Sequence, residues 1–351
     1  MPAPPSAADV VSVVLPVHDG ADDLPACLDA LLGQEGTDIQ VVAVDDGSTD
    51  ASGSILDSYA ACRPALTVVH TENHGAGRAR LTGLAHAQGS HIGFCDCGDR
   101  PAPNMYATLL GRAQEASADL VVCGFRRVDA ADGRLLSEEM CGLGQGPCDI
   151  DEDPGILLAV NTAVWNKLYR AASLKDTGRV PVPPRVGEDV VFQLLAYPHV
   201  GRIACVAEPL YEYRVRPGSL MSDVGLADLD LLRLGLLEAK RLLAEGGGSE
   251  EMQALYDLVA FTHLGVSLPL RLEAAREMPL SQALGWARAV LERDFPRYSR
   301  SRFCSPGYVL GHRGRNLGLS GALLCQRLHL MLPLLGLLRQ AAVRRWGIRY
   351  W

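Results

Sequence analysis

Residues 10–17, with the sequence VVSVVLPV, begin the segment that decides the fold. They form a continuous apolar run rich in β-branched residues, which is typical of a strand covered on both faces. In residues 22–34 the apolar positions recur about every 3.6 residues, which predicts a helix. Residues 39–44 predict a second buried strand. Strand, helix and strand in this order predict two parallel strands joined by a crossover helix.

The same alternation continues as far as residue 125. Further strands are predicted at residues 66–70, 91–95 and 120–125, and further helices at residues 50–60, 75–87 and 104–116. We therefore expect an α/β fold with a Rossmann-like, mostly parallel mixed sheet flanked by helices. In such sheets, ligands bind at the carboxyl ends of the strands.

The pattern changes after residue 125. Residues 126–155 are rich in Gly and Asp and lack periodicity, which predicts a surface excursion. Regular structure is predicted again at residues 164–169. A helix is predicted at residues 188–197, and strands near residues 202–206 and 209–215. Further helices are predicted at residues 226–244, 250–268, 280–292 and 317–343. We expect residues 1–125 and 126–222 to be two halves of one domain, and residues 223–351 to form a helical C-terminal region.

Composition narrows the class of protein. The chain has 351 residues, of which 48% are hydrophobic and 21% charged, as in a globular protein with a sizeable core. Its net charge of −8 argues against nucleic-acid binding. The longest apolar run, residues 328–338, is shorter than the roughly 20 residues that span a membrane. Residues 1–5 lack the features of a secretory signal, and the scattered cysteines form no Cys-x-x-Cys pair, so we expect a cytoplasmic protein with reduced thiols.

Acidic residues follow two of the predicted strands. Residues 44–50 read VDDGSTD, and residues 94–99 read FCDCGD. Neither a Gly-x-Gly-x-x-Gly motif nor a P-loop is present, which argues against a dinucleotide oxidoreductase or a P-loop enzyme. Carboxylates at strand ends can accept hydrogen bonds from a base or ribose, or hold a divalent cation against a diphosphate. Each motif alone is equally compatible with a helix cap or a turn.

Six segments taken together resemble the inverting family 2 glycosyltransferases, which have a nucleotide-sugar-binding GT-A fold. In chain order they are residues 11–19 (VSVVLPVHD), 44–50 (VDDGSTD), 73–80 (NHGAGRAR), 164–170 (VWNKLYR), 187–189 (GED) and 211–219 (YEYRVRPGS). The resemblance covers about residues 10–222. It implies transfer of a sugar from a nucleotide-diphosphate donor, expected to be a UDP-sugar, with inversion at the anomeric carbon.

The resemblance also assigns a donor site. Its residues are Pro16, Val17, His18, Asp45, Asp46, Arg80, Asp96 and Arg216. The His18 ring would stack on the base, and Asp46, or less favourably Asp45, would accept a hydrogen bond from it. Arg80 would approach the ribose or phosphate. Arg216 would neutralise the departing diphosphate, because a guanidinium pairs well with phosphate oxygens.

The same resemblance implies the catalytic and acceptor residues. Asp189 would be the general base that takes the proton of an acceptor hydroxyl, and Glu188 would orient Asp189 or contact the acceptor. Trp165, Asn166 and Lys167 would bind an acceptor that is a glycan, a lipid-linked sugar or a small metabolite. Two structural alternatives stay open: Trp165 as a core residue, and Glu188 and Asp189 as acids that stabilise a helix N-terminus.

One departure from the family pattern concerns the metal. The family usually has Asp-x-Asp-Asp after the fourth strand, whereas this chain has Gly98 at the central position of Asp96-Cys97-Gly98-Asp99. Three outcomes are open. Mg²⁺ or Mn²⁺ could be held by Asp96 and Asp99 with the diphosphate and waters. The metal could be dispensed with, its charge supplied by Arg216 or Arg80. Alternatively, catalysis is lost and the protein is a nucleotide-sugar-binding scaffold. A second departure is Leu81, where the family motif has Asn.

The C-terminal residues have a distinct charge pattern. After Asp294 the chain contains ten arginines and no acidic residue, and leucines recur through residues 317–338. Arginine combined with leucine and terminal aromatic residues is typical of a helix that lies on an anionic membrane surface. The alternative is a helix pair that packs on the acidic domain. If the C-terminal helix binds a membrane, we expect a peripheral protein on the inner face of that membrane.

Overall fold

The computed structural model describes residues 10–141, 146–179, 183–216, 224–311 and 317–337. These residues form two compact units. The first takes its described residues from 1–152, 160–183 and 195–216, and the second from 153–159, 184–194 and 217–351. Two short segments, 153–159 and 184–194, belong with the C-terminal helices. The expected division into halves 1–125 and 126–222 of one domain and a helical region 223–351 stays a prediction.

The first unit is built on one mixed sheet. In the described residues the strand order is β3-β2-β1-β4-β9-β6-β10-β5, with β7 beside β6 and β8 beside β10. The strands are β1 (Val11–Val17), β2 (Ile39–Asp46), β3 (Leu66–Thr71), β4 (His91–Phe94), β5 (Arg100–Pro101), β6 (Leu120–Asp129), β7 (Leu135–Glu139), β8 (Cys148–Asp149), β9 (Lys167–Arg170) and β10 (Arg202–Val215).

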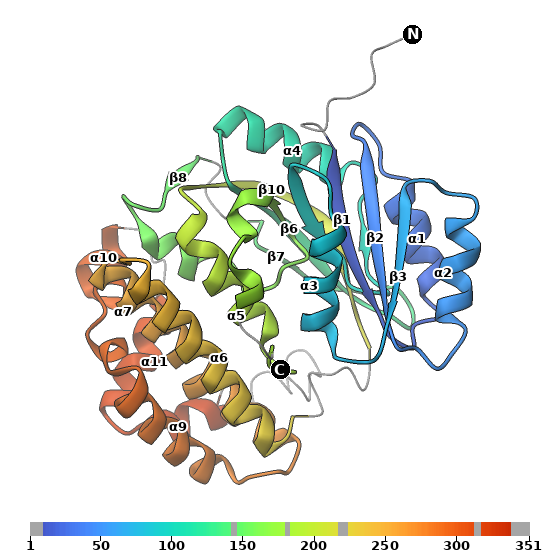
Figure 1. The fold of residues 1–351 in the computed structure, drawn as a ribbon. Helices are drawn as coiled ribbons and strands as arrows, with labels where there is room; N and C mark the ends of the chain where they lie inside the picture. Colours follow the sequence, from blue (N-terminus) through green and yellow to red (C-terminus); the bar gives the residue numbers. More distant parts are fainter. Residues whose placement is uncertain (1–9, 142–145, 180–182, 217–223, 312–316, 338–351) are drawn as a thin grey trace. The chain divides into compact units, whose positions relative to one another are not determined.

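Strands β1 to β4 form the parallel part of this sheet. β1 lies between β2 and β4, and β2 pairs with β3, all in parallel. β9 runs antiparallel between β4 and β6, whereas β6 and β10 are parallel to each other. Figure 1 shows β1, β2 and β3 side by side. The α/β fold predicted from the alternating pattern is confirmed.

Four helices cover the two faces of the sheet: α1 (Leu24–Leu32), α2 (Ser52–Ala60), α3 (Ala76–His86) and α4 (Met105–Ala116). Residues of α1, α2 and α4 share one core with the odd-numbered residues of β1. α3 packs on the other face, where Gly83 lies against the even-numbered residue Val14, and Figure 1 shows it in front of the strands. This division follows from the alternation of side chains along a strand.

The structure corrects three of the expected elements. Residues 126–155 are not wholly irregular, because β6 continues to Asp129 and pairs with β7. The two strands expected at residues 202–206 and 209–215 are one strand, β10, with register shifts between Val206 and Tyr211. The helix expected at residues 317–343 is interrupted after Arg327, and residues 331–337 are helical again. Its last part, residues 338–343, lies outside the described residues.

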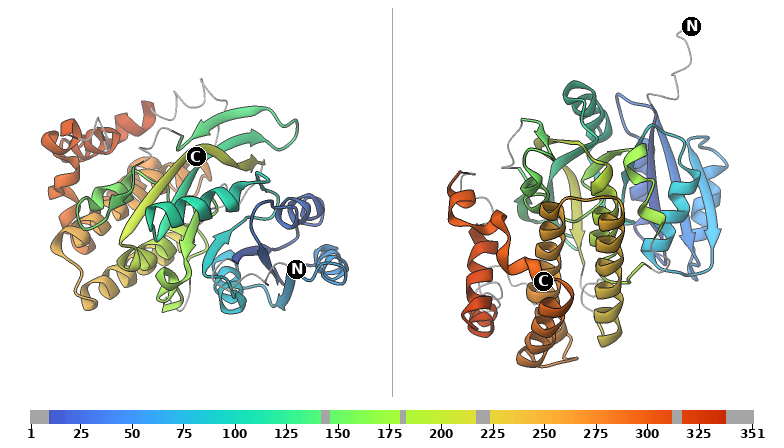
Figure 2. Two further views of the ribbon diagram at one scale, coloured as in Figure 1. Left: turned by 90° about the horizontal axis from the view of Figure 1, so that it is seen from above. Right: turned by 60° about the vertical axis from the view of Figure 1, so that its left-hand side comes forward.

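The second unit is helical. Its longer helices are α5 (Glu188–Ala196), which ends in the first unit, and α6 (Leu226–Glu245), α7 (Glu250–Ala260), α8 (Leu268–Ala274), α9 (Leu280–Asp294), α10 (Pro306–Gly311) and α11 (Leu317–Arg327). A π-helical segment, Phe261–Ser267, joins α7 to α8. α6 packs against α7 and α8 against α9, and the right-hand view of Figure 2 shows helices of this unit running side by side. Within the described residues, no helix is both long enough and apolar enough to cross a membrane.

The contact between α3 and β1 leads to a stability prediction. A Cβ atom added to Gly83 would overlap Cγ1 of Val14 and lie 3.2 Å from its Cγ2, whereas a Cβ on Gly111 of α4 would have no neighbour within 4 Å. Both positions are helical, so both Ala substitutions gain similar helix propensity, about 1 kcal/mol. We expect the free energy of unfolding of Gly83→Ala to be lower than that of Gly111→Ala by about 1–3 kcal/mol, from overpacking. Chemical denaturation of both variants measures this, and equal stabilities would contradict the packing described here.

Candidate functional site

The site lies where β1, β2 and β4 end. Because β1 pairs in parallel with both neighbours, Val17 lies beside Asp45 of β2, and Val14 lies beside Phe94 of β4. The residues that follow these strands, His18 and Asp96 among them, therefore come to one edge of the sheet. This is the edge at which the sequence predicted a nucleotide site.

Asp45 connects β2 to β3. Its buried carboxylate accepts a hydrogen bond from the backbone N–H of Ser48 at 3.0 Å, and its Oδ2 lies 2.8 Å from Nδ1 of His70. Burial alone raises the pKa of Asp45, but the hydrogen bonds with Ser48 and His70 outweigh burial and hold this pKa below its ordinary value. Asp45 is therefore a carboxylate at neutral pH, and its contacts with Ser48 and His70 fix the turn that follows β2.

Asp46 anchors the beginning of α3. Its Oδ1 accepts from the backbone N–H of His74 at 2.9 Å, and its Oδ2 accepts from the N–H of Gly75 at 2.7 Å. Gly75 precedes α3 and has φ +86, a conformation that glycine adopts without strain. A carboxylate at this end of a helix also meets the positive end of the helix dipole. The sequence predicted Asp46 as a base-binding residue, and the structure adds this positioning role.

Arg80 extends from α3 to the loop after β4. Its guanidinium is buried and Nη2 donates to Oδ1 of Asp96 at 2.8 Å. The side chain of Asp96 is about one third exposed, at 34%, so one face of the pair is open to solvent. The structure thus brings together two residues that the sequence predicted for the donor site.

Asp99 faces inward from the same loop. Its Oδ2 accepts from the hydroxyl of Tyr211 at 2.9 Å, and its Oδ1 accepts from the backbone N–H of Arg214 at 2.9 Å. Burial raises the pKa of Asp99 well above its ordinary value, and the nearby charge of Asp96 raises it further. The sequence did not single out Tyr211 as a site residue, although its alternation with Tyr213 in β10 is a signal that two aromatic rings share one face of the strand.

Arg216 follows β10 and reaches the same loop. Its Nη2 lies 2.8 Å from Oδ2 of Asp23, the residue that precedes α1. Both side chains are partly exposed, at 36% and 31%. Gly98 has φ +105, and a Cβ atom there would overlap Nη2 of Arg216 and lie 2.7 Å from its Cζ. Sequence reasoning missed Asp23, because it lies in no motif of the resemblance.

The residues predicted for base binding differ in exposure. Pro16 and Val17 are buried at the end of β1, whereas His18 is exposed and accepts a hydrogen bond at Nε2 from Nδ2 of Asn73, at 3.0 Å. Asp19, which the sequence did not single out, accepts from the backbone N–H of Thr49 at 2.6 Å. These contacts connect the segments that follow β1, β2 and β3, and they leave the His18 ring at the surface.

The three residues predicted for acceptor binding are buried. Trp165 stacks on Tyr211 and Tyr213, with ring centroids 4.6 Å and 5.4 Å away. Asn166 donates from Nδ2 to the carbonyl of Cys123 at 2.8 Å. Lys167 is fully buried, and its ammonium donates to Oδ1 of Asn161, at 2.6 Å, and to three other oxygens. These contacts give the three residues a structural role, and their contact with an acceptor stays a prediction.

Glu188 and Asp189 belong to the second unit. They form the first turn of α5, directly after Gly187, which has φ +79. Acidic residues at this end of a helix are stabilised by the helix dipole. The structure therefore agrees with the helix-terminus alternative that the sequence left open, and their catalytic roles stay predictions.

The loop after β4 offers a poor set of ligands for a divalent metal ion. Asp96 is paired with Arg80, both oxygens of Asp99 accept hydrogen bonds, and the family's third carboxylate is replaced by Gly98. Among the described residues, no group of three or more His, Cys, Asp or Glu side chains could hold a metal ion. The predicted ligand pair of Asp96 and Asp99 does not fit Mg²⁺ or Mn²⁺, which need several converging oxygen ligands.

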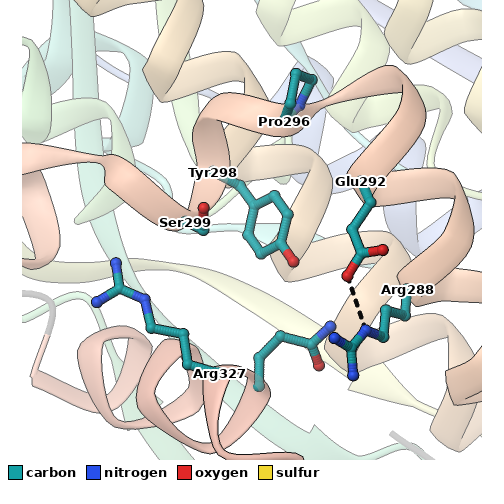
Figure 3. Close-up of a pocket in the computed structure, with 7 residues that line it drawn as sticks. Arg288, Glu292, Pro296, Tyr298, Ser299 and Arg327 are labelled. Atoms are coloured by element: carbon teal, nitrogen blue, oxygen red, sulfur yellow. Dashed lines mark hydrogen bonds and ion pairs between the residues drawn. The ribbon is translucent and has the colours of Figure 1, made fainter.

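A separate pocket lies in the second unit. It has a volume of about 240 Å³, and its lining residues are Arg288, Glu292, Pro296, Tyr298, Ser299, Gln326 and Arg327. Figure 3 shows Arg288 and Arg327 on either side of Tyr298, with Arg288 paired to Glu292 at 2.8 Å. None of the residues that the sequence predicted for the donor, the acceptor or catalysis lines this pocket.

The contact of Asp45 with His70 leads to a prediction on pH. Hydrogen bonds with Asp45 and Asp57 raise the pKa of His70 above 6.5. A raised pKa stabilises the folded state fully below pH 6.5, and this contribution is lost as pH rises through the folded pKa. The loss of stability in His70→Gln, measured by chemical denaturation, should therefore be greater at about pH 5.5 than at about pH 8.5. In Asp45→Asn, the pKa of His70 followed by NMR should fall; an unchanged pKa would contradict the pairing.

Comparison with known proteins agrees with this fold and these motifs. Residues 12–145 match the model of glycosyl transferase family 2. The chain is 35% identical over 229 residues to the glycosyltransferase GlyG of Streptococcus pneumoniae, covering 61% of this chain and 73% of GlyG. It is 31% identical over 216 residues to the glycosyltransferase EpsJ of Bacillus subtilis, covering 60% of this chain and 62% of EpsJ.

A solved structure shares the fold. The crystal structure of residues 1–349 of S. aureus TarS, in complex with UDP-GlcNAc, superimposes with a TM-score of 0.62 and 22% identity, covering 89% of this chain and 90% of that one. The alternation and periodicity of the sequence predicted the central sheet, its flanking helices and the C-terminal helices. The chain therefore belongs to the family 2 glycosyltransferases and has their GT-A fold.

Proposed function

We propose that this protein transfers a sugar from a nucleotide-diphosphate donor to an acceptor hydroxyl, with inversion at the anomeric carbon. The observation that carries the proposal is the convergence of Arg80 and Arg216 on the loop that follows β4. They come from α3 and from the end of β10, and a carboxylate holds each guanidinium, Asp96 for Arg80 and Asp23 for Arg216. Arg216 is partly exposed and can pair with a phosphate, whereas Arg80 is buried and holds Asp96 beside it.

The base of the donor would bind beside these arginines. His18 is exposed at the end of β1, next to the segments that Asp45 and Asp46 fix. The ring of His18 can stack on a base. Asp46 already accepts two hydrogen bonds, and its oxygens have further lone pairs that can accept from a base N–H. We propose a uridine nucleotide, with support from the fold shared with TarS, whose crystal structure contains UDP-GlcNAc.

Asp189 is the proposed general base, and Glu188 would orient it or contact the acceptor. In an inverting transfer the acceptor oxygen attacks the anomeric carbon while its proton passes to a carboxylate, and the nucleoside diphosphate leaves with the electron pair of the broken C–O bond. The matching sequence Gly187-Glu188-Asp189 supports this role. The acceptor would be a glycan, a lipid-linked sugar or a small metabolite.

A second candidate function is a nucleotide-sugar-binding scaffold without catalysis. Gly98 favours this candidate, because a carboxylate usual in the family is missing. Asp189 favours the enzyme, because a scaffold needs no general base. The two candidates share donor binding and differ only in turnover.

Substitution of the proposed base separates the two candidates. We expect Asp189→Asn to lower the turnover number about 10²–10⁴-fold, the usual contribution of general-base catalysis, and to leave the affinity for UDP unchanged. Turnover is measured as UDP released from a panel of UDP-sugars with glycan and lipid-linked acceptors, and affinity by calorimetry. The control is Asp230→Asn, which changes an exposed carboxylate of α6 in the same unit. Full turnover by Asp189→Asn would refute the assignment of the base, and UDP binding by a wild type without turnover would favour the scaffold.

We also propose that the C-terminal helices bind an anionic membrane surface from the cytoplasmic side. Large apolar side chains are exposed on α10, on α11 and on the segment that follows α11. They are Leu310, Leu317, Leu324, Leu328, Leu330, Leu332 and Leu337, each between 47% and 82% exposed. Arg327 lies among them, whereas the arginines from Arg339 onward lie outside the described residues. Exposed leucines with cations and no acidic residues suit a lipid interface.

Vesicle sedimentation tests this surface. We expect the full chain to sediment with vesicles of phosphatidylcholine and phosphatidylglycerol, and the double variant Leu324→Glu, Leu328→Glu to bind about tenfold more weakly or worse. The control is Leu234→Glu, which places the same charge on an equally exposed leucine of α6. Equal sedimentation of the double variant and the wild type would exclude the leucine surface as the contact.

A further inference from the structure

We propose that the guanidinium of Arg216 takes the place of a divalent metal ion as the cation that binds the donor diphosphate. The inference rests on the proposed function, because it presupposes a nucleotide-diphosphate ligand. It goes beyond that function by stating that binding of the donor needs no metal.

The position of Arg216 depends on the absence of a side chain at residue 98. A Cβ atom on Gly98 would overlap Nη2 of Arg216 and lie 2.7 Å from Cζ and 3.0 Å from Nη1. Gly98 also has φ +105, which strains any residue with a side chain. A carboxylate at this position and the guanidinium where it lies now exclude each other. Gly98 and Arg216 therefore form a matched pair, in which the cation fills the space of the missing ligand.

The two remaining carboxylates of the motif, Asp96 and Asp99, already accept hydrogen bonds from other side chains or from the backbone. Oδ1 of Asp96 accepts from Arg80, whose side chain is only 5% exposed, whereas the side chain of Asp96 is 34% exposed. Asp99 is buried between the hydroxyl of Tyr211 and the backbone N–H of Arg214. A metal ion at Asp96 would lie beside the positive charge of Arg80, which repels it, and would find Asp99 turned toward β10.

The contact with Asp23 prepares Arg216 for an anion. Asp23 neutralises the guanidinium at 2.8 Å, and both side chains are partly exposed, so solvent and ligand can reach the pair. A diphosphate carries more negative charge than one carboxylate and offers bidentate partners to the planar guanidinium. In the proposed transfer, breakage of the anomeric C–O bond leaves its electron pair on the diphosphate. Arg216 keeps its proton throughout and pairs with the added negative charge.

The first test measures the metal requirement. UDP, GDP and dTDP are titrated into the full-length wild type by calorimetry, once with EDTA and once with excess MnCl₂. We expect the nucleotide that binds to do so with the same dissociation constant, within about twofold, in both buffers. Binding that is tenfold or more tighter with Mn²⁺ would overturn the inference and leave the proposed function standing. Absence of binding by all three nucleotides in both buffers would overturn the proposed function as well.

The second test removes the cation. In EDTA, Arg216→Gln should bind UDP about 10–100-fold more weakly, as expected for the loss of charge-assisted hydrogen bonds, and should bind uridine as the wild type does. Arg216→Lys keeps the charge without the planar fork and should lose less affinity. The control, Arg126→Gln, removes an exposed arginine of β6 that pairs with Glu138. Equal UDP affinity of Arg216→Gln and the wild type would overturn the inference.

The third test uses the exclusion between residues 98 and 216. Gly98→Ala should displace the guanidinium and weaken UDP binding in EDTA, although it changes no charge. Gly98→Ala and Arg216→Gln would act on the same contact. The affinity of the double variant for UDP should therefore equal that of whichever single variant has the lower affinity. Thermal unfolding of each variant confirms that it is folded. Additive losses would show that Gly98 acts independently of Arg216 and would contradict the matched pair.

Discussion

The contact on which the candidate site depends is that of the Asp46 carboxylate with the backbone at the beginning of α3. The N–H groups of His74 and Gly75 both donate to Asp46, so the end of β2 fixes where α3 begins. The position of α3 places Arg80, and Arg80 in turn holds Asp96 in the loop after β4. A buried carboxylate is costly unless hydrogen bonds satisfy it, and the first N–H groups of a helix have no partners within the helix. The N–H groups thus satisfy the buried carboxylate of Asp46, and this carboxylate gives these N–H groups the acceptor that the helix does not provide.

The acidic residues at the strand ends serve two purposes. Asp45, Asp46 and Asp99 are buried, and each has partners: Ser48 and His70 for Asp45, backbone N–H groups for Asp46, and Tyr211 and Arg214 for Asp99. Among the predicted donor-site residues, the side chains left open to solvent are His18, Asp96 and Arg216. The inner carboxylates position the loops, and the outer groups are the ones most exposed to a ligand. A motif that looks wholly functional in sequence is therefore divided by burial into a structural layer and a binding layer.

The sequence predicted the elements of the parallel sheet well, because strands buried on both faces are continuous apolar runs and the helices between them are amphipathic. The prediction from sequence failed where contacts between distant segments determine the length of a strand or the partner of a side chain. Leu120–Asp129 was expected to stop at residue 125, but pairing with β7 carries the strand onward. Trp165 was ambiguous in sequence, and the stack with Tyr211 and Tyr213 places it in the core. Asp23 was not predicted, since no local pattern reveals a partner that lies at the far end of β10.

The consequence of having glycine and not aspartate at residue 98 becomes clear only in three dimensions. In sequence, a glycine within an acidic motif suggests a lost ligand and hence a lost activity. In the structure, the space beside its Cα is filled by a guanidinium that a side chain would exclude. A metal site requires several carboxylates to converge, and their mutual repulsion must be offset whenever the metal is absent. A guanidinium held by one carboxylate carries its charge permanently and needs no such cluster. The absence of a carboxylate at residue 98 therefore makes room for Arg216. In the arrangement that we propose, its guanidinium replaces an exchangeable metal ion.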